Sequence, residues 1–139
     1  MIEILTNEEF EKMKASGKIL QEVFKTCRDF IKPGVSTHDV DKLCYDIIRS
    51  HDAIPSFLNF GQPPFPGTIC ASVNDEVVHG IPKKNRILQD GDIISVDVGA
   101  ILAYEPGMGP ENTEGEYMRL ARFDHVDTKL VSGDRKSVV

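Results

Sequence analysis

The sequence predicts an α+β domain in which two helices are followed by antiparallel strands. Apolar residues recur at three- and four-residue steps over residues 6–31 and again over residues 36–48, which is the period of a helix with one buried face. From residue 53 onward this period gives way to short apolar and β-branched runs separated by Gly, Pro, Asn and Asp. At 139 residues, the chain has the size of one domain.

A capping box predicts the start of the first helix. Thr6 stands three positions before Glu9, so each side chain can bond the backbone N–H of the other residue. The helix is expected to end near residues 32–34, because Pro33 has no backbone N–H to donate and Gly34 permits a turn. Seven residues are expected to form its core-facing side: Phe10, Met13, Gly17, Leu20, Phe24, Cys27 and Ile31.

The second helix is expected to begin at a cap formed by Ser36 or Thr37. His38 and His51 lie near its two ends, where a histidine is most simply a solvated or capping residue. The cysteines of both helices fall on apolar faces, which favours core packing over catalysis. The buried side of the second helix is predicted to consist of Val40, Leu43, Cys44, Ile47 and Ile48.

The chain from residue 53 to residue 98 is predicted to be strands and loops. Residues 55–60 are expected to be extended, and residues 61–67 contain too much proline and glycine for anything but a loop. Residues 68–73 and 76–79 are predicted to be two strand pieces separated by a turn at Asn74. Residues 93–98 are apolar on both faces, as in a buried strand.

The bulk composition excludes some partners and favours a cellular compartment. With 22 acidic and 16 basic residues the net charge is −6, which disfavours nucleic acid and anionic membrane surfaces as partners. Cys27, Cys44 and Cys70 are an odd number of cysteines without paired spacing, and no leader or apolar run of membrane-spanning length is present. We therefore expect a cytoplasmic protein with reduced thiols.

Two residues stand where chemistry is expected. His79 precedes a Gly and lies near a Pro, and Asp97 lies inside an apolar run. A buried carboxylate loses its hydration, so Asp97 requires a cation or several hydrogen-bond donors nearby. Taken alone, a histidine in such a segment is more often structural, and a lone aspartate is ambiguous.

Two strings carry a specific resemblance to a known family. Residues 77–82 read Val-Val-His-Gly-Ile-Pro, and residues 91–99 read Gly-Asp-Ile-Ile-Ser-Val-Asp-Val-Gly. Together they closely resemble the type I methionine aminopeptidases of peptidase family M24, and the likeness runs from about residue 4 to about residue 102. The resemblance implies the N-terminal half of the duplicated "pita-bread" (creatinase/aminopeptidase) fold, here two helices followed by antiparallel strands.

The resemblance also implies an activity, cofactors and partners. The activity is metal-dependent removal of the N-terminal (initiator) methionine from nascent proteins. Its cofactors are two divalent ions per intact site, of Co, Mn, Fe or Zn, which activate water and polarise the scissile carbonyl. The implied partners are N-terminal methionine peptides or nascent chains, with the ribosome as a further docking partner, and the protein is expected to be a monomer.

Individual residues take roles from the same resemblance. Asp97 matches a divalent-metal ligand, and His79 matches a residue that donates a hydrogen bond to the substrate amide. Phe65 and Cys70 match the wall of the pocket for the methionine side chain, and Asn74 matches a monovalent-cation contact.

The likeness stops after residue 102. The family's second metal-binding aspartate, about eleven residues beyond Asp97, is absent, and Met108 stands at that position. Gln62 also replaces the tyrosine that many relatives carry in the pocket loop. We therefore divide the chain into residues 1–102, the N-terminal part of a catalytic domain, and residues 103–139, an unmatched tail that lacks the apolar content to complete a sheet.

The tail is expected to be disordered or foreign sequence. Its last six residues, Asp-Arg-Lys-Ser-Val-Val at 134–139, are what the DNA string GATCGGAAGAGCGTCGTG of a widely used sequencing adapter encodes. A divergent natural extension is the competing interpretation. An evolved binding module would carry a C-terminus with a regular pattern that can pack, whereas a fragment joined to foreign sequence would not.

These observations leave alternative functions open. The first is the metalloaminopeptidase, with this chain expected to be inactive alone because one ligand cannot hold a metal pair. The second is a non-catalytic module of the same fold that binds a protein or the ribosome. A third is a proline-specific or creatine-hydrolysing relative, against which the short N-terminus and the string at 77–82 argue.

Overall fold

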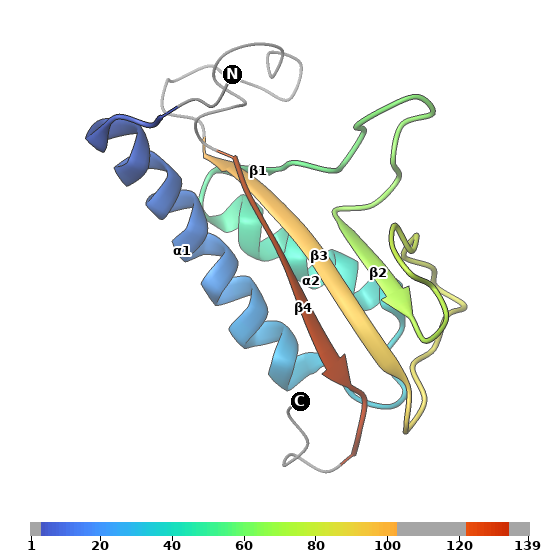
Figure 1. Cartoon of the computed structure of the whole chain (residues 1–139). Coiled ribbons are helices and arrows are strands. Elements are labelled where there is room, and N and C mark those ends of the chain that lie inside the picture. Colours follow the sequence, from blue (N-terminus) through green and yellow to red (C-terminus); the bar gives the residue numbers. More distant parts are fainter. Residues whose placement is uncertain (1–3, 103–121, 134–139) are drawn as a thin grey trace.

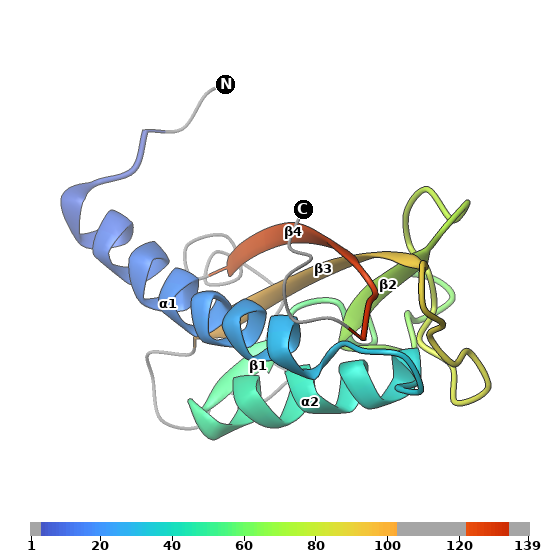
Figure 2. The ribbon, with the colours of Figure 1, turned by 90° about the horizontal axis from the view of Figure 1, so that it is seen from below.

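Two helices pack against one face of a sheet in the part of the chain that the structure describes (Figures 1 and 2). The structure is a computed structural model that describes residues 4–102 and 122–133, with only the backbone described at 122–127. Helices α1 (Asn7–Phe30) and α2 (Thr37–Ser50) come first in the chain. Neither helix is long and apolar enough to cross a membrane.

Strand β3 (Ile93–Leu102) is the centre of the sheet, and every pairing is antiparallel. Strands β1 (Ala53–Pro55) and β2 (Ile69–Val73) pair with successive parts of β3, and β4 (Arg122–Leu130) pairs along residues 93–101 of β3. Because β4 overlaps both other pairings, β1 and β2 must share one edge of β3 and β4 must take the other.

The first helix begins as predicted. The Glu9 backbone N–H donates to Thr6 Oγ1 at 3.3 Å, and the Thr6 N–H donates to Glu9 Oε2 at 2.6 Å. The helix ends at Phe30, close to the predicted stop. The prediction for Phe10 was wrong: it was expected to face the core, but its side chain is 50% exposed. The buried residues of α1 begin only at Ser16, so its first turns bury no side chain against the described part of the chain.

The second helix confirms the predicted cap and face. The Asp39 N–H donates to Ser36 Oγ at 3.0 Å. His51 is the C-terminal cap residue, and its ring Nε2 lies 2.6 Å from Glu22 Oε2 of α1. The buried positions are Thr37, Val40, Cys44 and Ile48, with Leu43 and Ile47 partly buried.

The core lies between the helices and one face of the sheet. Alternate residues of a strand point to opposite faces, so only every second residue of β2 and β3 can reach this layer. Burying a large aliphatic side chain contributes about 1.5–3 kcal/mol, which makes this layer the main source of stability. The strand residues in it include Ile69, Ala71 and Val73 of β2 and Ile94, Val96 and Val98 of β3.

Three strand predictions need correction. The extended segment is Ala53–Pro55, and the chain then turns, with Asn59 at φ 63°. Residues 76–79 form a loop and not a strand. Strand β3 is longer than predicted and is not buried on both faces along its first half, because Ile93 is 50% exposed and Asp97 is only partly buried.

Strand β4 was not predicted from the sequence. The tail was expected to lack the apolar content for a sheet, yet Arg122–Leu130 pairs with β3 and Val131 is completely buried. The Lys129 ammonium donates to the carbonyl of Arg28 and, at 2.8 Å, to that of Ile31, at the end of α1. A sheet edge offers unpaired N–H and C=O groups to any extended segment, so pairing does not require an apolar sequence.

Candidate functional site

The candidate site begins with two residues on neighbouring strands. Cys70 of β2 and Asp97 of β3 are direct cross-strand partners. Residues paired in this way project from the same face of a sheet. Because Ala71 and Val96 face the helices, Cys70 and Asp97 belong to the opposite face. The structure therefore brings together two residues that the sequence assigned to one site.

The thiol of Cys70 is buried and stays protonated. Burial raises its pKa, and the negative charge of Asp97 raises it further, to about 11. Both effects disfavour a thiolate, since one removes its hydration and the other repels its charge. At neutral pH Cys70 therefore presents a neutral, weakly polar surface and is not a nucleophile.

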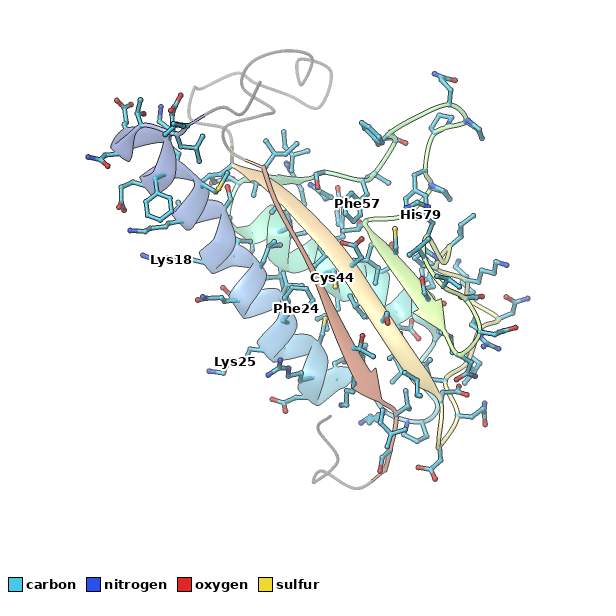
Figure 3. The ribbon with its side chains drawn as sticks, viewed as in Figure 1. Lys18, Phe24, Lys25, Cys44, Phe57 and His79 are labelled. Carbon is cyan, nitrogen blue, oxygen red and sulfur yellow. The ribbon has the colours of Figure 1, made fainter. Side chains whose placement is uncertain are left out.

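His79 lies on an exposed loop that Gly80 holds against β2. The Ala71 N–H donates to the Gly80 carbonyl at 2.8 Å, and the Gly80 N–H donates to Ser72 Oγ at 3.1 Å. A Cβ on Gly80 would lie 2.2 Å from the carbonyl oxygen of Ala71, so only glycine fits. His79 itself has φ 58°, and Figure 3 shows it near the start of β2.

The turn between β2 and this loop explains why the predicted second strand piece does not form. Asn74 adopts φ 57°, which reverses the chain after Val73. The Val73 N–H then donates to Glu76 Oε2 at 3.0 Å. Two residues with positive φ, Asn74 and His79, bracket the segment, and an extended strand cannot contain such a conformation.

Phe65 lies in the proline-rich loop before β2. Its N–H donates to the carbonyl of Phe60, and its carbonyl accepts from the N–H of Asn59, both at 2.8 Å. At the end of this loop, a Cβ on Gly67 would lie 2.9 Å from Cδ of Pro82. The loop that carries Phe65 and the segment that follows His79 are therefore in close contact.

Asn74 uses its side chain in structural hydrogen bonds. Its amide Nδ2 donates to Asp92 Oδ1 at 2.8 Å, and its Oδ1 accepts from the Ile93 N–H at 3.0 Å. The bond from Asn74 and a second from the Gln89 backbone hold the pKa of Asp92 below its ordinary value. These contacts join the turn after β2 to the start of β3. The cation-binding role of Asn74 stays a prediction.

Asp41 of α2 supports the site and was missed in the sequence. One carboxylate oxygen, Oδ1, accepts from the N–H of Thr68 at 2.7 Å and from the N–H of Ile69 at 3.0 Å. Burial raises the pKa of Asp41, although both hydrogen bonds act in the opposite direction. The sequence offered only its position next to Val40, on the predicted buried side of the helix, and no local signal for its partners. Asp41 fixes the start of β2 just before Cys70.

The described residues do not fit a pair of metal ions. Within residues 4–102 and 122–133, no three His, Cys, Asp or Glu side chains converge in a way that could hold one ion, the side chains at 122–127 not being described. A metal pair needs several deprotonated donors at fixed distances. Asp97 with the protonated Cys70 opposite it does not meet this need. Met108 lies outside the described residues.

Comparisons with known proteins agree on one family. The model of metallopeptidase family M24 matches residues 11–105. The methionine aminopeptidase of Clostridium acetobutylicum is 51% identical over 102 residues, which are 73% of this chain and 40% of that relative. The Escherichia coli K12 methionine aminopeptidase is 40% identical over 101 residues, or 72% of this chain and 38% of the relative. The chain thus spans about 40% of the length of the curated relatives it matches.

Solved structures agree with the sequence comparisons and confirm the predicted fold. The methionine aminopeptidase of Thermotoga maritima gives a TM-score of 0.76 at 35% identity, over 95% of this chain and 46% of that one. The methionine aminopeptidase of Rickettsia prowazekii gives 0.69 at 44% identity, over 73% of this chain and 40% of that one. The chain therefore belongs to metallopeptidase family M24 and has the α+β, pita-bread fold of the methionine aminopeptidases that it matches.

Proposed function

We propose that this chain supplies the N-terminal part of a methionine aminopeptidase, which removes the initiator methionine from nascent proteins with the aid of divalent metal. The observation that carries the proposal is the pairing of Cys70 with Asp97 on the face away from the helices, within the stretch that matches the family. Gly80 holds the loop of His79 against β2, the strand that carries Cys70.

In this proposal the described residues bind and orient the substrate. Phe65 and the protonated Cys70 form an apolar wall for the methionine side chain, which is unbranched and polarizable. His79 donates a hydrogen bond to the substrate amide and stabilises the developing charge. Asp97 is one ligand of the metal. The remaining ligands are not among the described side chains, so we assign no step of hydrolysis to these residues alone.

The finer parts of the proposal follow from the family. The metal is a pair of Co, Mn, Fe or Zn ions, the substrates are N-terminal methionine peptides or nascent chains, and the protein works as a cytoplasmic monomer. The membership in a family of metallopeptidases supports the metal, and the names of the relatives support the substrate. Sedimentation velocity checks the oligomeric state, and a dimer at micromolar concentration would contradict the monomer.

The test is turnover of a Met-Ala-Ser peptide by the purified chain with added Co or Mn, measured as released methionine. We expect no significant turnover and only feeble metal binding by calorimetry, because one carboxylate cannot hold a metal pair. The Asp97→Asn variant is the matched control for contaminating peptidase. A rate near that of the full-length Escherichia coli enzyme, lost in this variant, would show that the chain completes the site by itself.

A second candidate function is favoured by strand β4. A non-catalytic module that binds a protein or the ribosome would keep a packed C-terminus, and Arg122–Leu130 does pair with β3 along nine registered positions. Cosedimentation with ribosomes at physiological salt tests this candidate. Retention in the ribosome pellet together with absent peptidase activity would favour it, and a chain that stays in the supernatant would remove the ribosome as the partner.

A further inference from the structure

The two helices bring two cysteine sulfurs together inside the core. Cys27 of α1 and Cys44 of α2 lie with their Sγ atoms 3.4 Å apart, although they are 17 residues apart in the chain. Their side chains are 2% and 0% exposed. Cys44, labelled in Figure 3, is a buried residue of α2 within the core cluster. The third cysteine, Cys70, belongs to the opposite face of the sheet.

We propose that hydrogen peroxide oxidises Cys27 and Cys44 to an intramolecular disulfide, a crosslink between α1 and α2. The sulfurs must approach from 3.4 Å to about 2.05 Å. Side-chain rotation and a small shift of one helix end can supply this approach, because Cys27 lies in the last turn of α1, which ends at Phe30.

The reaction balances with peroxide as the oxidant. One thiolate attacks a peroxide oxygen, so that an S–O bond forms, the O–O bond breaks, and the leaving hydroxide takes up the thiol proton as water. The second sulfur then attacks the sulfenic sulfur, so that the S–S bond forms, the S–O bond breaks, and a second water leaves. Two thiols lose two electrons, and one peroxide becomes two waters.

The burial of both thiols makes formation of the disulfide slow and selective. The hydrogen bond with Cys27 and burial both raise the pKa of the Cys44 thiol, so its thiolate is scarce in the packed state. Attack requires brief opening of the contact between the helices, which is easiest at the end of a helix. Cys44 also lies one turn after Asp41, whose carboxylate holds the start of β2. The crosslink would therefore fix the helices that support the candidate site.

The experiment treats the full, reduced chain with hydrogen peroxide and maps its tryptic peptides by mass spectrometry without reduction. We expect residues 26–28 and 43–49 to be released as one linked species that dithiothreitol separates. The oxidised chain should melt roughly 10 °C higher, as expected for closing a loop of about this length. The Cys70→Ser variant should still form the link, whereas Cys27→Ser and Cys44→Ser should not.

Two results would overturn the proposal. One is a folded chain whose Cys27 and Cys44 stay as thiols after prolonged peroxide treatment, while the same chain oxidises in urea. The other is oxidation confined to Cys70, as sulfinic acid or as a disulfide between two chains. Peptide mapping of the unsubstituted chain decides between these outcomes, so the test does not depend on whether the serine variants fold.

Discussion

Asp97 lies directly across from Cys70 on the neighbouring strand, and its charge contributes to raising the pKa of that thiol to about 11. The relationship joins a carboxylate from β3 to a thiol from β2, on the face that the helices leave uncovered. The reactivity of the Cys70 thiol therefore depends on the charge of Asp97.

The Asp97→Asn variant should therefore lower the pKa of Cys70. Burial is the larger cause of the shift, so the pKa should fall only in part and stay above the ordinary value of 9.0. The measurement is the pH dependence of Cys70 alkylation by iodoacetamide, followed by peptide mass spectrometry. Asp92→Asn, directly before the start of β3, is the control. It should leave the pH dependence of Cys70 alkylation unchanged. An unchanged profile in Asp97→Asn would contradict the electrostatic contact.

Gly80→Ala should be strongly destabilising. The new Cβ would lie 2.2 Å from the backbone oxygen of Ala71, and the backbone of β2 cannot move aside cheaply because it is paired with β3. We expect a loss of about 2–4 kcal/mol of unfolding free energy, measured by urea denaturation. Gly133→Ala is the matched control, because a Cβ there meets nothing within 4 Å. Equal stability of the two variants would show that the loop of His79 is not held against β2.

Asp92 should make stability depend on pH in the acidic range. Hydrogen bonds from Asn74 and Gln89 hold its folded pKa below the ordinary value. An acid of this kind stabilises the fold above its unfolded pKa of about 3.9, and that contribution is lost as the pH falls through the folded pKa. Urea denaturation of Asp92→Asn should thus show a smaller loss of stability from pH 7 to pH 3 than the unsubstituted chain shows.

Asn74→Gly provides the partner for a double-mutant cycle on the same contact. Glycine keeps the positive φ of residue 74 and removes only the side chain that bonds Asp92. In this background, Asp92→Asn should change the pH dependence less than it does alone. An effect of the same size in both backgrounds would mean that Asn74 does not set the pKa of Asp92.

Lys129→Met should weaken the attachment of β4 to α1. The ammonium donates to the carbonyls of Arg28 and Ile31 at the end of that helix, and methionine keeps the stem but no donor. Loss of charge-assisted hydrogen bonds of this kind costs about 1–3 kcal/mol. Lys25→Met is the control, since Lys25 is exposed on α1 and points away from the sheet (Figure 3). The melting temperature of Lys129→Met should be lower than that of Lys25→Met. Equal melting temperatures would mean that the hydrogen bonds of Lys129 to α1 are not formed in solution.

Local features of the fold could be predicted because their causes lie within a few residues. The capping box of Thr6, the cap at Ser36 or Thr37 and the helix end near Pro33 depend on neighbours one turn away. The structure confirms them, with Ser36 as the cap of the second helix. The strings at residues 77–82 and 91–99, around His79 and Asp97, indicated the family by resemblance, and the comparisons confirm it. Their catalytic roles stay predictions.

Other features could not be predicted because they depend on residues far apart in the chain. Nothing near Asp41 indicates that its carboxylate will meet the backbone of Thr68, and nothing near Cys27 indicates that Cys44 will lie beside it. The same holds for the Cys70–Asp97 pair, which exists because of the register between β2 and β3.

The sequence by itself determined two amphipathic helices, their ends, the loop before β2 and the membership in the family. Only the tertiary structure decided that residues 76–79 are a loop, that Ile93 is exposed and that residues 122–130 add a strand to the open edge of β3. The physical reason is one of distance along the chain. Periodicity and caps act over one or two turns, whereas burial and strand pairing are settled only when distant segments compete for the same surface.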